Sequence, residues 1–273
     1  MIRVEDDAGR EVELAREAQR IVSLVPSLTE ALFALGCGEA VVGVTRYCTE
    51  PAGIVERLKR VGGTKNPNLA RIRELQPDLV LLNAEENRRE DFEALERAGL
   101  TVFVTFPYRA RDVGGLLRRI GRLTGTDPRA AQLAGELDCT LDELARAEPA
   151  PPIRVFCPIW KNPWMSFNRE TYAHDMLALA GGSNVCAGRA ERYCTVVLSD
   201  IAAAQPDVIL LPDEPYVFTP KVLPDLEPLR DTPAWRANRI HFIDGKELSW
   251  YGPRSAPAMH HLRALLTRPA LAP

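Results

Sequence analysis

Short apolar runs alternate with amphipathic stretches along the first third of the chain. Arg20–Leu24 has the form of a buried parallel strand. Leucines and alanines then recur at helical spacing over residues 28–35, and Val41–Thr45 is typical of the next strand. The pattern therefore predicts a βαβ unit, in which Ser27 and Glu30 form a capping box at the start of the helix.

One phrase of fifteen residues occurs twice. Leu69–Asn83 and Leu198–Pro212 each contain an amphipathic helix, a Gln-Pro-Asp turn and a buried apolar strand. The second copy follows the first at a distance of 129 residues, so each half of the 273-residue chain carries one copy. A long-period repeat of this kind predicts two similar lobes, and a ligand is expected in the cleft between them.

A mainly helical region separates the two copies. Leucines continue at helical spacing over residues 112–148, and the part after Pro128 is long enough for a helix of roughly 30 Å. We therefore expect an α/β fold of two similar lobes with mainly parallel sheets, joined by one long backbone helix. The expected boundaries are 1–110 for the N-terminal lobe, 111–150 for the spanning helix and 151–273 for the C-terminal lobe.

Composition and charge narrow the possible partners. The net charge is −3 and no run of basic residues or long apolar stretch occurs, so we expect no nucleic-acid partner and no membrane insertion. Most of the six cysteines are expected to be small buried residues, although Cys186 and Cys194 can close a short disulfide loop in an exported protein. The polar N-terminus shows no export signal. We expect a cytoplasmic protein if Met1 is the natural start, and a periplasmic or otherwise extracytoplasmic one if a signal has been removed.

Motifs for catalysis and for bare metal ions are missing from the sequence. There is no nucleophile elbow, dinucleotide fingerprint, phosphate loop or zinc-protease motif, so we expect no enzyme. Two pairs of adjacent acids, Asp213 with Glu214 and Glu85 with Glu86, suit acid–base chemistry, and a two-lobed enzyme of the nucleotide-sugar or nitrogenase type is the catalytic alternative. Only four histidines exist, and His260 and His261 are adjacent, which argues against a site for bare zinc or manganese.

Residues that follow the expected strand ends are the candidate ligand-binding residues, because ligands of open α/β sheets bind beyond the carboxyl ends of the strands. The first half provides Pro26, Ser27, Tyr47, Lys65, Asn66, Glu85 and Phe106, and the second half provides Trp160, Trp164, Tyr193, Glu214, Trp250, Tyr251 and Arg254. The aromatic members suit a large, flat, neutral macrocycle. We expect Trp160 and Tyr251 to be open to ligand, whereas Trp164 and Trp250 fit the lobe core equally well. Lys65 and Arg254 suit an anionic ligand instead.

Several segments together resemble one protein family. RIVSLVPSLTEALFALG, NLARIRELQPDLVLL and GGSNV are similar to the class III solute-binding proteins of siderophore, haem and vitamin B12 importers. RVFCPIWKNPWMS, RYCTEPAG and SWYGPRSAP resemble the vitamin B12-binding branch. The resemblance implies a protein with no cofactor of its own that holds a cobalamin-like corrinoid in its cleft for ABC-type uptake. A ferric siderophore or haem is the alternative ligand.

Two features depart from the family pattern. The resemblance implies a permease-docking glutamate at the start of each repeated helix, and those positions hold Ala70 and Ser199, with Asp200 as a shifted candidate for the second. The loop Val61–Asn68 also lacks the tryptophan that the B12 branch carries near Lys65. A cytoplasmic corrinoid binder without a permease is therefore a further alternative. In each case we expect a monomer that binds a small-molecule metal complex.

Overall fold

The computed structural model describes residues 1–146 and 151–267. Residues 147–150 and 268–273 lie outside this description, and with them the predicted end of the spanning helix and the last residues of the predicted C-terminal lobe. Contacts within the chain divide it into two compact units. Unit 1 consists of Met1–Pro107, Arg111–Cys139 and Tyr251–Pro253; unit 2 consists of Tyr108–Ala110, Thr140–Trp250 and the residues from Arg254 onward.

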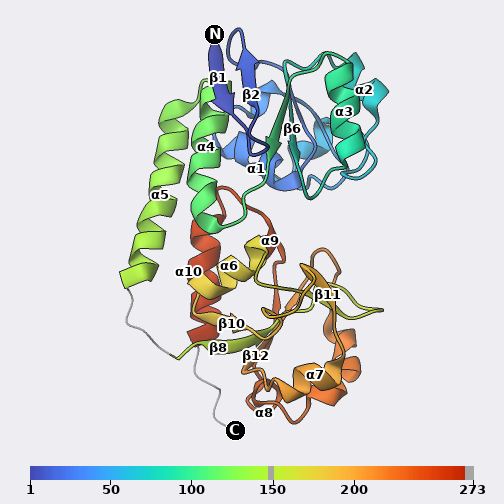
Figure 1. The fold of residues 1–273 in the computed structure, drawn as a ribbon, viewed down its shortest axis with the longest axis vertical. Helices are drawn as coiled ribbons and strands as arrows, with labels where there is room; N and C mark the ends of the chain where they lie inside the picture. Colours follow the sequence, from blue (N-terminus) through green and yellow to red (C-terminus); the bar gives the residue numbers. More distant parts are fainter. Residues whose placement is uncertain (147–150, 268–273) are drawn as a thin grey trace. The chain divides into compact units, whose positions relative to one another are not determined.

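Unit 1 is built on a five-stranded sheet in which every neighbouring pair of strands is parallel (Figure 1). The strand order is β5-β4-β3-β6-β7. An antiparallel hairpin of β1 and β2, which the sequence pattern did not predict, precedes it. The elements are β1 (Ile2–Glu5), β2 (Glu11–Leu14), β3 (Ile21–Ser23), α1 (Pro26–Ala34), η1 (Gly38–Ala40), β4 (Val41–Val44), η2 (Val55–Arg57), β5 (Lys59–Arg60), α2 (Leu69–Glu74), β6 (Leu79–Asn83), α3 (Arg89–Arg97), β7 (Val102–Thr105), α4 (Ala110–Thr124) and α5 (Asp127–Arg146).

The two faces of the unit 1 sheet are covered by different helices. Every second residue of β3, β6 and β7 packs against α2 and α3, through the buried side chains of Ile72 and Leu95. Phe103 of β7 projects from the other face, where the Arg119 guanidinium of α4 lies 5.6 Å from its ring centroid. Figure 1 shows the strands between these two helical layers. Burial on both faces explains why the strands are apolar without alternation.

Unit 2 has a four-stranded parallel sheet with the order β10-β8-β12-β13 and a separate antiparallel pair of β9 and β11. The elements are β8 (Ile153–Phe156), β9 (Met165–Phe167), α6 (Tyr172–Leu179), β10 (Gly182–Asn184), β11 (Tyr193–Thr195), α7 (Leu198–Ala203), β12 (Val208–Pro212), η3 (Pro220–Leu229), α8 (Pro233–Arg236), β13 (Ile240–Ile243), α9 (Lys246–Ser249) and α10 (Ser255–Thr267). One face of the sheet packs against α7, η3 and α8, while α6, α9 and α10 pack together. The expectation of α/β lobes with mainly parallel sheets is confirmed.

The helix predicted after Pro128 is also confirmed. It is α5, a single helix of 20 residues; its residues up to Cys139 belong to unit 1 and those from Thr140 onward to unit 2. Helix α4 packs closely on its first part, because Gly121 has no side chain: a Cβ atom there would lie 2.4 Å from the Cβ of Ala130. No helix among the described residues is both long and apolar enough to cross a membrane.

The repeated phrase forms the same pair of hydrogen bonds in both units. In unit 1 the Asp78 amide donates to the Arg20 carbonyl at 2.8 Å, and the Asp78 carboxylate accepts from the Arg20 amide at 3.0 Å. In unit 2 Asp207 bonds to Arg154 in the same two ways, at 2.8 and 2.9 Å. The motif therefore ties the turn between helix and strand to the start of the neighbouring strand.

The glutamine of each repeat has a left-handed backbone. Gln76 has a φ of 44° and Gln205 a φ of 49°, and each follows the C-cap residue of its helix. This conformation is typical of the residue that ends a helix, and glycine usually supplies it. The following proline cannot continue the helix, so the chain turns directly into the buried strand.

The predicted capping box at the start of α1 is wrong. Helix α1 begins at Pro26 and its N-cap is Val25, which makes no side-chain capping bond. Proline suits the first helical position because its fixed φ is helical. An amide at that position would make no hydrogen bond within the helix, so the missing N–H of proline costs none. Ser27 consequently lies inside the first turn of the helix, where it is buried.

Replacing Asp207 with asparagine is expected to lower the free energy of unfolding by about 1–2 kcal/mol near neutral pH. The hydrogen bond from Arg154 holds the pKa of the Asp207 carboxyl below its ordinary value, against the opposing effect of burial. A carboxyl with a lowered folded-state pKa stabilises the protein above its unfolded-state pKa, and this contribution is lost as the pH falls through the folded-state pKa. The difference between wild type and variant should therefore shrink below about pH 4.

Urea unfolding at pH values from 7 to 3 measures this difference. Asp138→Asn is the matched control, because Asp138 pairs with Arg118 while its side chain is 52% exposed. That variant should stay within about 0.5 kcal/mol of wild type at every pH. An Asp207→Asn effect independent of pH would contradict a role for the charge.

Candidate functional site

Most of the candidate residues lie just beyond strand ends or in the segments that follow them, as the sequence predicts, whereas Tyr193 lies within a strand. In unit 1, β3 leads to Pro26 and Ser27, β4 to Tyr47, β5 to Lys65 and Asn66, β6 to Glu85, and β7 to Phe106. In unit 2, β8 leads to Trp160 and Trp164, β12 to Glu214, and β13 to Trp250 and Arg254, while Tyr193 lies in β11. Since the strands of each main sheet are parallel, their carboxyl ends share one edge in each unit.

Two buried asparagines organise the loop after β6. The Asn83 side chain accepts from the amides of Glu85 and Glu86 at 2.8 and 3.1 Å. Asn87 accepts from the Asn83 amide at 2.8 Å and donates to the Thr64 carbonyl at 2.9 Å. These bonds join the loops after β5 and β6, so the polar edge of unit 1 has a fixed shape.

The loop after β5 brings four of the candidates close together. The Lys65 ammonium donates to the Glu85 carbonyl at 2.5 Å. Tyr47 approaches the same loop at Gly63, where an added Cβ atom would lie 3.2 Å from Cε2 of Tyr47 and 2.4 Å from Oδ1 of Asn66. A larger residue at position 63 would therefore displace the Asn66 side chain. Tyr47 remains 55% exposed, which leaves most of its ring available to a ligand.

Tyr251 does not present the open ring that the sequence predicts. It is only 5% exposed and belongs to unit 1, where its hydroxyl accepts from Nδ2 of Asn83 at 2.8 Å and lies 3.2 Å from the Thr105 hydroxyl. Burial raises the pKa of this phenol, and the nearby Ser27 hydroxyl opposes the rise. The Tyr251 side chain is therefore part of the unit 1 core.

A row of four aromatic side chains runs from the interior to the surface of unit 2, and we call it the aromatic row. Trp164 stacks on Phe218 with ring centroids 5.9 Å apart, and Phe218 contacts Tyr216 at 4.7 Å. Tyr216 in turn meets Trp160 edge to face at 5.5 Å. Exposure rises from 4% at Phe218 to 42% at Trp160. The core thus supports an indole that faces solvent, as the sequence predicts for Trp160.

Three other candidates of unit 2 form one polar cluster. The Trp250 indole donates to the Glu214 carboxylate at 2.7 Å, and the Arg254 guanidinium lies 5.1 Å from the Trp250 ring centroid. Trp250 is only 4% exposed, which favours the core alternative for it. Burial raises the pKa of Glu214, while the bond from Trp250 and the charge of Lys246 lower it. Arg254 also pairs with Asp244 at 3.6 Å, so its charge is already balanced by the protein.

The remaining candidates are less closely connected. Tyr193 is 41% exposed on β11, with the Arg192 guanidinium 5.9 Å from its ring centroid. Phe106 is half-buried, and its amide donates to Asp7 at 2.6 Å. Tyr216 and Phe218 are the two members of the aromatic row that the sequence candidates did not include. Their position in the loop that follows β12 was the available signal.

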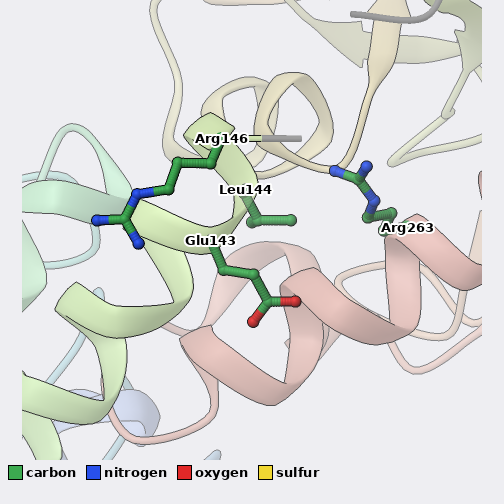
Figure 2. Close-up of a pocket in the computed structure, with 4 residues that line it drawn as sticks. All are labelled: Glu143, Leu144, Arg146 and Arg263. Carbon is green, nitrogen blue, oxygen red and sulfur yellow. The ribbon is translucent and has the colours of Figure 1, made fainter. Parts of the chain in front are cut away.

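A hollow of about 380 Å³ lies elsewhere in unit 2, between the end of α5 and α10 (Figure 2). Glu143, Leu144, Arg146 and Arg263 line it. Figure 2 shows the Glu143 side chain directed toward α10, and its carboxylate lies 4.0 Å from Nε2 of His260. The hollow contains none of the candidates. The part of the chain that the structure describes also holds no group of three or more metal-ligating side chains that could bind a metal ion.

Most of the cysteines lie in the interior of the two units. All six lie in the described ranges and are free thiols, and five of them are buried, which confirms the expectation for most of them. Cys186 and Cys194 belong to the core that also contains the aromatic-row residue Phe218. Burial raises the pKa of Cys186 to about 11, so this thiol stays protonated near neutral pH.

Known proteins with this fold allow the chain to be classified. The vitamin B12-binding protein of Yersinia pestis (strain Pestoides F) is 26% identical over 201 residues, covering 72% of this chain and 70% of that protein. The crystal structure of the periplasmic vitamin B12-binding protein BtuF of Vibrio cholerae aligns with a TM-score of 0.80 at 21% identity, over 91% of this chain and 96% of that one. The periplasmic heme-binding protein RhuT from Roseiflexus sp. RS-1 also gives 0.80, at 28% identity, over 91% and 98%.

The resemblance noted in the sequence is thus repeated at the level of the fold. The model of one family, described as periplasmic binding protein, matches residues 21–246, which include the first βα unit, both copies of the repeated phrase and eleven of the fourteen candidate residues. A match over most of the chain, together with these relatives, settles the classification: the chain belongs to the periplasmic binding protein family.

Proposed function

We propose that this protein is the solute-binding component of an ABC-type importer and that its ligand is a corrinoid. The observation that carries the ligand class is the aromatic row, which ends in the 42% exposed indole of Trp160. A supported, exposed indole can lie against a flat macrocycle and bury apolar area without a large loss of side-chain entropy. The similarity to vitamin B12-binding proteins supports the same choice.

The exposure of each candidate side chain decides the role that we propose for it. We propose Tyr47, Lys65 and Asn66 of unit 1 and Trp160 and Tyr193 of unit 2 as direct ligand contacts. Glu85, Trp164, Glu214 and Arg254 would then support these contacts, while the buried Pro26, Ser27, Trp250 and Tyr251 would shape the edges that carry them. The cleft between the lobes stays a prediction from the sequence.

Haem is the second candidate, and one residue favours it. Tyr47 is an exposed phenol with the Arg46 guanidinium 6.0 Å from its ring centroid. A tyrosine oxygen can serve as an axial ligand of haem iron, and an adjacent arginine can pair with a propionate. The 28% identity to a heme-binding protein also supports this candidate.

We further propose an extracytoplasmic location, as in relatives whose names call them periplasmic. Contact with a permease would need surfaces other than the two expected glutamates. Ala70 and Ser199 are exposed at the second positions of α2 and α7, and the shifted candidate Asp200 is paired with Arg189 at 2.9 Å. We infer that docking, where it occurs, uses different charges. The protein would act by binding alone, without catalysis.

Calorimetric titration with cyanocobalamin, cobinamide, haemin and a ferric siderophore tests the proposed function. A corrinoid should bind with a dissociation constant below about 10 μM, equivalent to roughly −7 kcal/mol. Tyr47→Phe separates the two candidates, because it removes the hydroxyl and keeps the ring. Corrinoid affinity should change less than threefold in this variant, whereas haemin affinity should fall at least tenfold if Tyr47 binds iron. Absence of binding by all four compounds would contradict both candidates.

A further inference from the structure

A second pocket of unit 2 lies apart from the aromatic row and has a different chemistry. Its volume is about 190 Å³, which exceeds the roughly 30 Å³ share of one water molecule several times. It is formed where the residues that precede α4 meet the start of α6. The lining residues are Tyr108, Arg109, Arg169, Thr171, His174 and Asp175, all in unit 2.

The charges that line this pocket are mainly positive. Arg109 and Arg169 contribute two guanidinium groups, against the single carboxylate of Asp175. One oxygen of that carboxylate already accepts from the Ala110 amide at 2.8 Å. A third guanidinium, from Arg192, lies 5.7 Å from the ring centroid of the lining residue Tyr108. The pocket therefore favours an anion over a cation or a neutral molecule.

His174 supplies an additional polar atom. Its Nδ1 is buried, and within residues 1–146 and 151–267 no protein group forms a hydrogen bond with it. Burial lowers the pKa of this imidazole, and the charges of Arg169 and Arg109 lower it further, while Asp175 opposes the change. Both arginines line the same pocket as the imidazole. A buried polar atom without a partner costs free energy, which a bound ligand can recover.

We propose that this pocket binds a small oxyanion of the phosphate class. Arg109 and Arg169 would pair with its oxygens through charge-assisted hydrogen bonds, and Nδ1 of His174, in the tautomer that carries a hydrogen there, would donate a third. The six lining residues include none of the residues proposed above as direct ligand contacts. The site goes beyond the proposed function and is independent of which macrocycle the protein binds.

Titration of the full chain with inorganic phosphate, at constant ionic strength set with chloride, tests the proposal. We expect saturable binding that Arg109→Gln and Arg169→Gln each weaken five- to tenfold. Arg111→Gln is the matched control, because it removes the same charge two residues away, from an exposed position that does not line the pocket. This variant should bind phosphate within twofold of wild type. Equal losses in all three variants, or no saturation in wild type, would overturn the site.

Proton NMR provides a second readout that does not depend on the arginine variants. The chain has only four histidines, and His174→Gln assigns the signal of His174. At fixed pH the ring resonances of His174 should move with the same phosphate dependence as the calorimetric signal. The resonances of the other three histidines should stay in place. A His174 signal that does not respond to phosphate would overturn the proposal even if the calorimetric binding is saturable. The Arg169→Gln variant should bind cobalamin or haemin as wild type does. A failure of the phosphate site can then be distinguished from a failure of the proposed function.

Discussion

Tyr251→Ala is expected to lower the free energy of unfolding by about 3–5 kcal/mol. The ring is 5% exposed, so its removal leaves a cavity in unit 1. The hydroxyl accepts from Asn83, so its loss also leaves the buried Nδ2 group of Asn83 without its shortest hydrogen bond. Tyr251→Phe removes only the hydroxyl and should cost about 1–3 kcal/mol.

Far-UV circular dichroism during urea unfolding measures both variants. Hydrogen exchange of residues 79–87 adds a local probe, since that segment contains Asn83 and the loop that Asn83 organises. Tyr47→Ala is the control, because its ring is 55% exposed in the same unit, and its stability should stay within about 0.5 kcal/mol of wild type. A Tyr251→Ala protein as stable as this control would show that the phenol is not part of the core.

Trp160→Ala is expected to weaken corrinoid binding about tenfold, a loss of roughly 1.4 kcal/mol, if the proposed function is correct. The indole provides an apolar face at the exposed end of the aromatic row, and alanine removes that contact area. Stability should fall much less than in Tyr251→Ala, because the indole is already 42% exposed in the free protein. Titration with cyanocobalamin, followed by calorimetry or by quenching of tryptophan fluorescence, measures the change.

Phe242→Ala is the matched control for the binding experiment. Phe242 has the same exposed fraction of 42% and lies in unit 2 on β13, but it is not a member of the aromatic row. Its replacement should leave corrinoid affinity unchanged. Equal affinity losses in the two variants would indicate a general effect on unit 2, and an unaffected Trp160→Ala protein would remove the main support for a macrocyclic ligand.

The local sequence pattern predicted the fold well because the fold is built from repeated helix–turn–strand units, each encoded by neighbouring residues. Both copies of the Gln-Pro-Asp phrase form a helix, a turn and a buried strand, as periodicity and proline indicated. The same reasoning did not find β10, since its three residues Gly182–Asn184 directly follow a helix-stopping glycine. The error at Ser27 was also local. A serine at the N-cap and a proline at the first helical position are both typical helix starts, and the local sequence does not decide which of the two residues begins the helix.

The candidate site was less predictable because burial depends on distant partners. Trp160 and Tyr251 are both expected after strand ends and both carry large rings, yet one is open and the other buried. What separates them is Asn83, which meets Tyr251 although the two residues are 168 positions apart. Trp250 is likewise held by Glu214, 36 positions away. No periodicity in the sequence contains this information.

The assignment of Tyr251–Pro253 to unit 1 bears on how the protein is made. Most of unit 1 is translated before the ribosome reaches these three residues. At that stage Asn83 lacks the Tyr251 phenol, which completes the core of the unit. We therefore expect the core of unit 1 to be completed only after Tyr251 has been translated. We expect this contact, which spans 168 positions of the sequence, to make the last step in folding of unit 1 depend on synthesis of the segment around Tyr251.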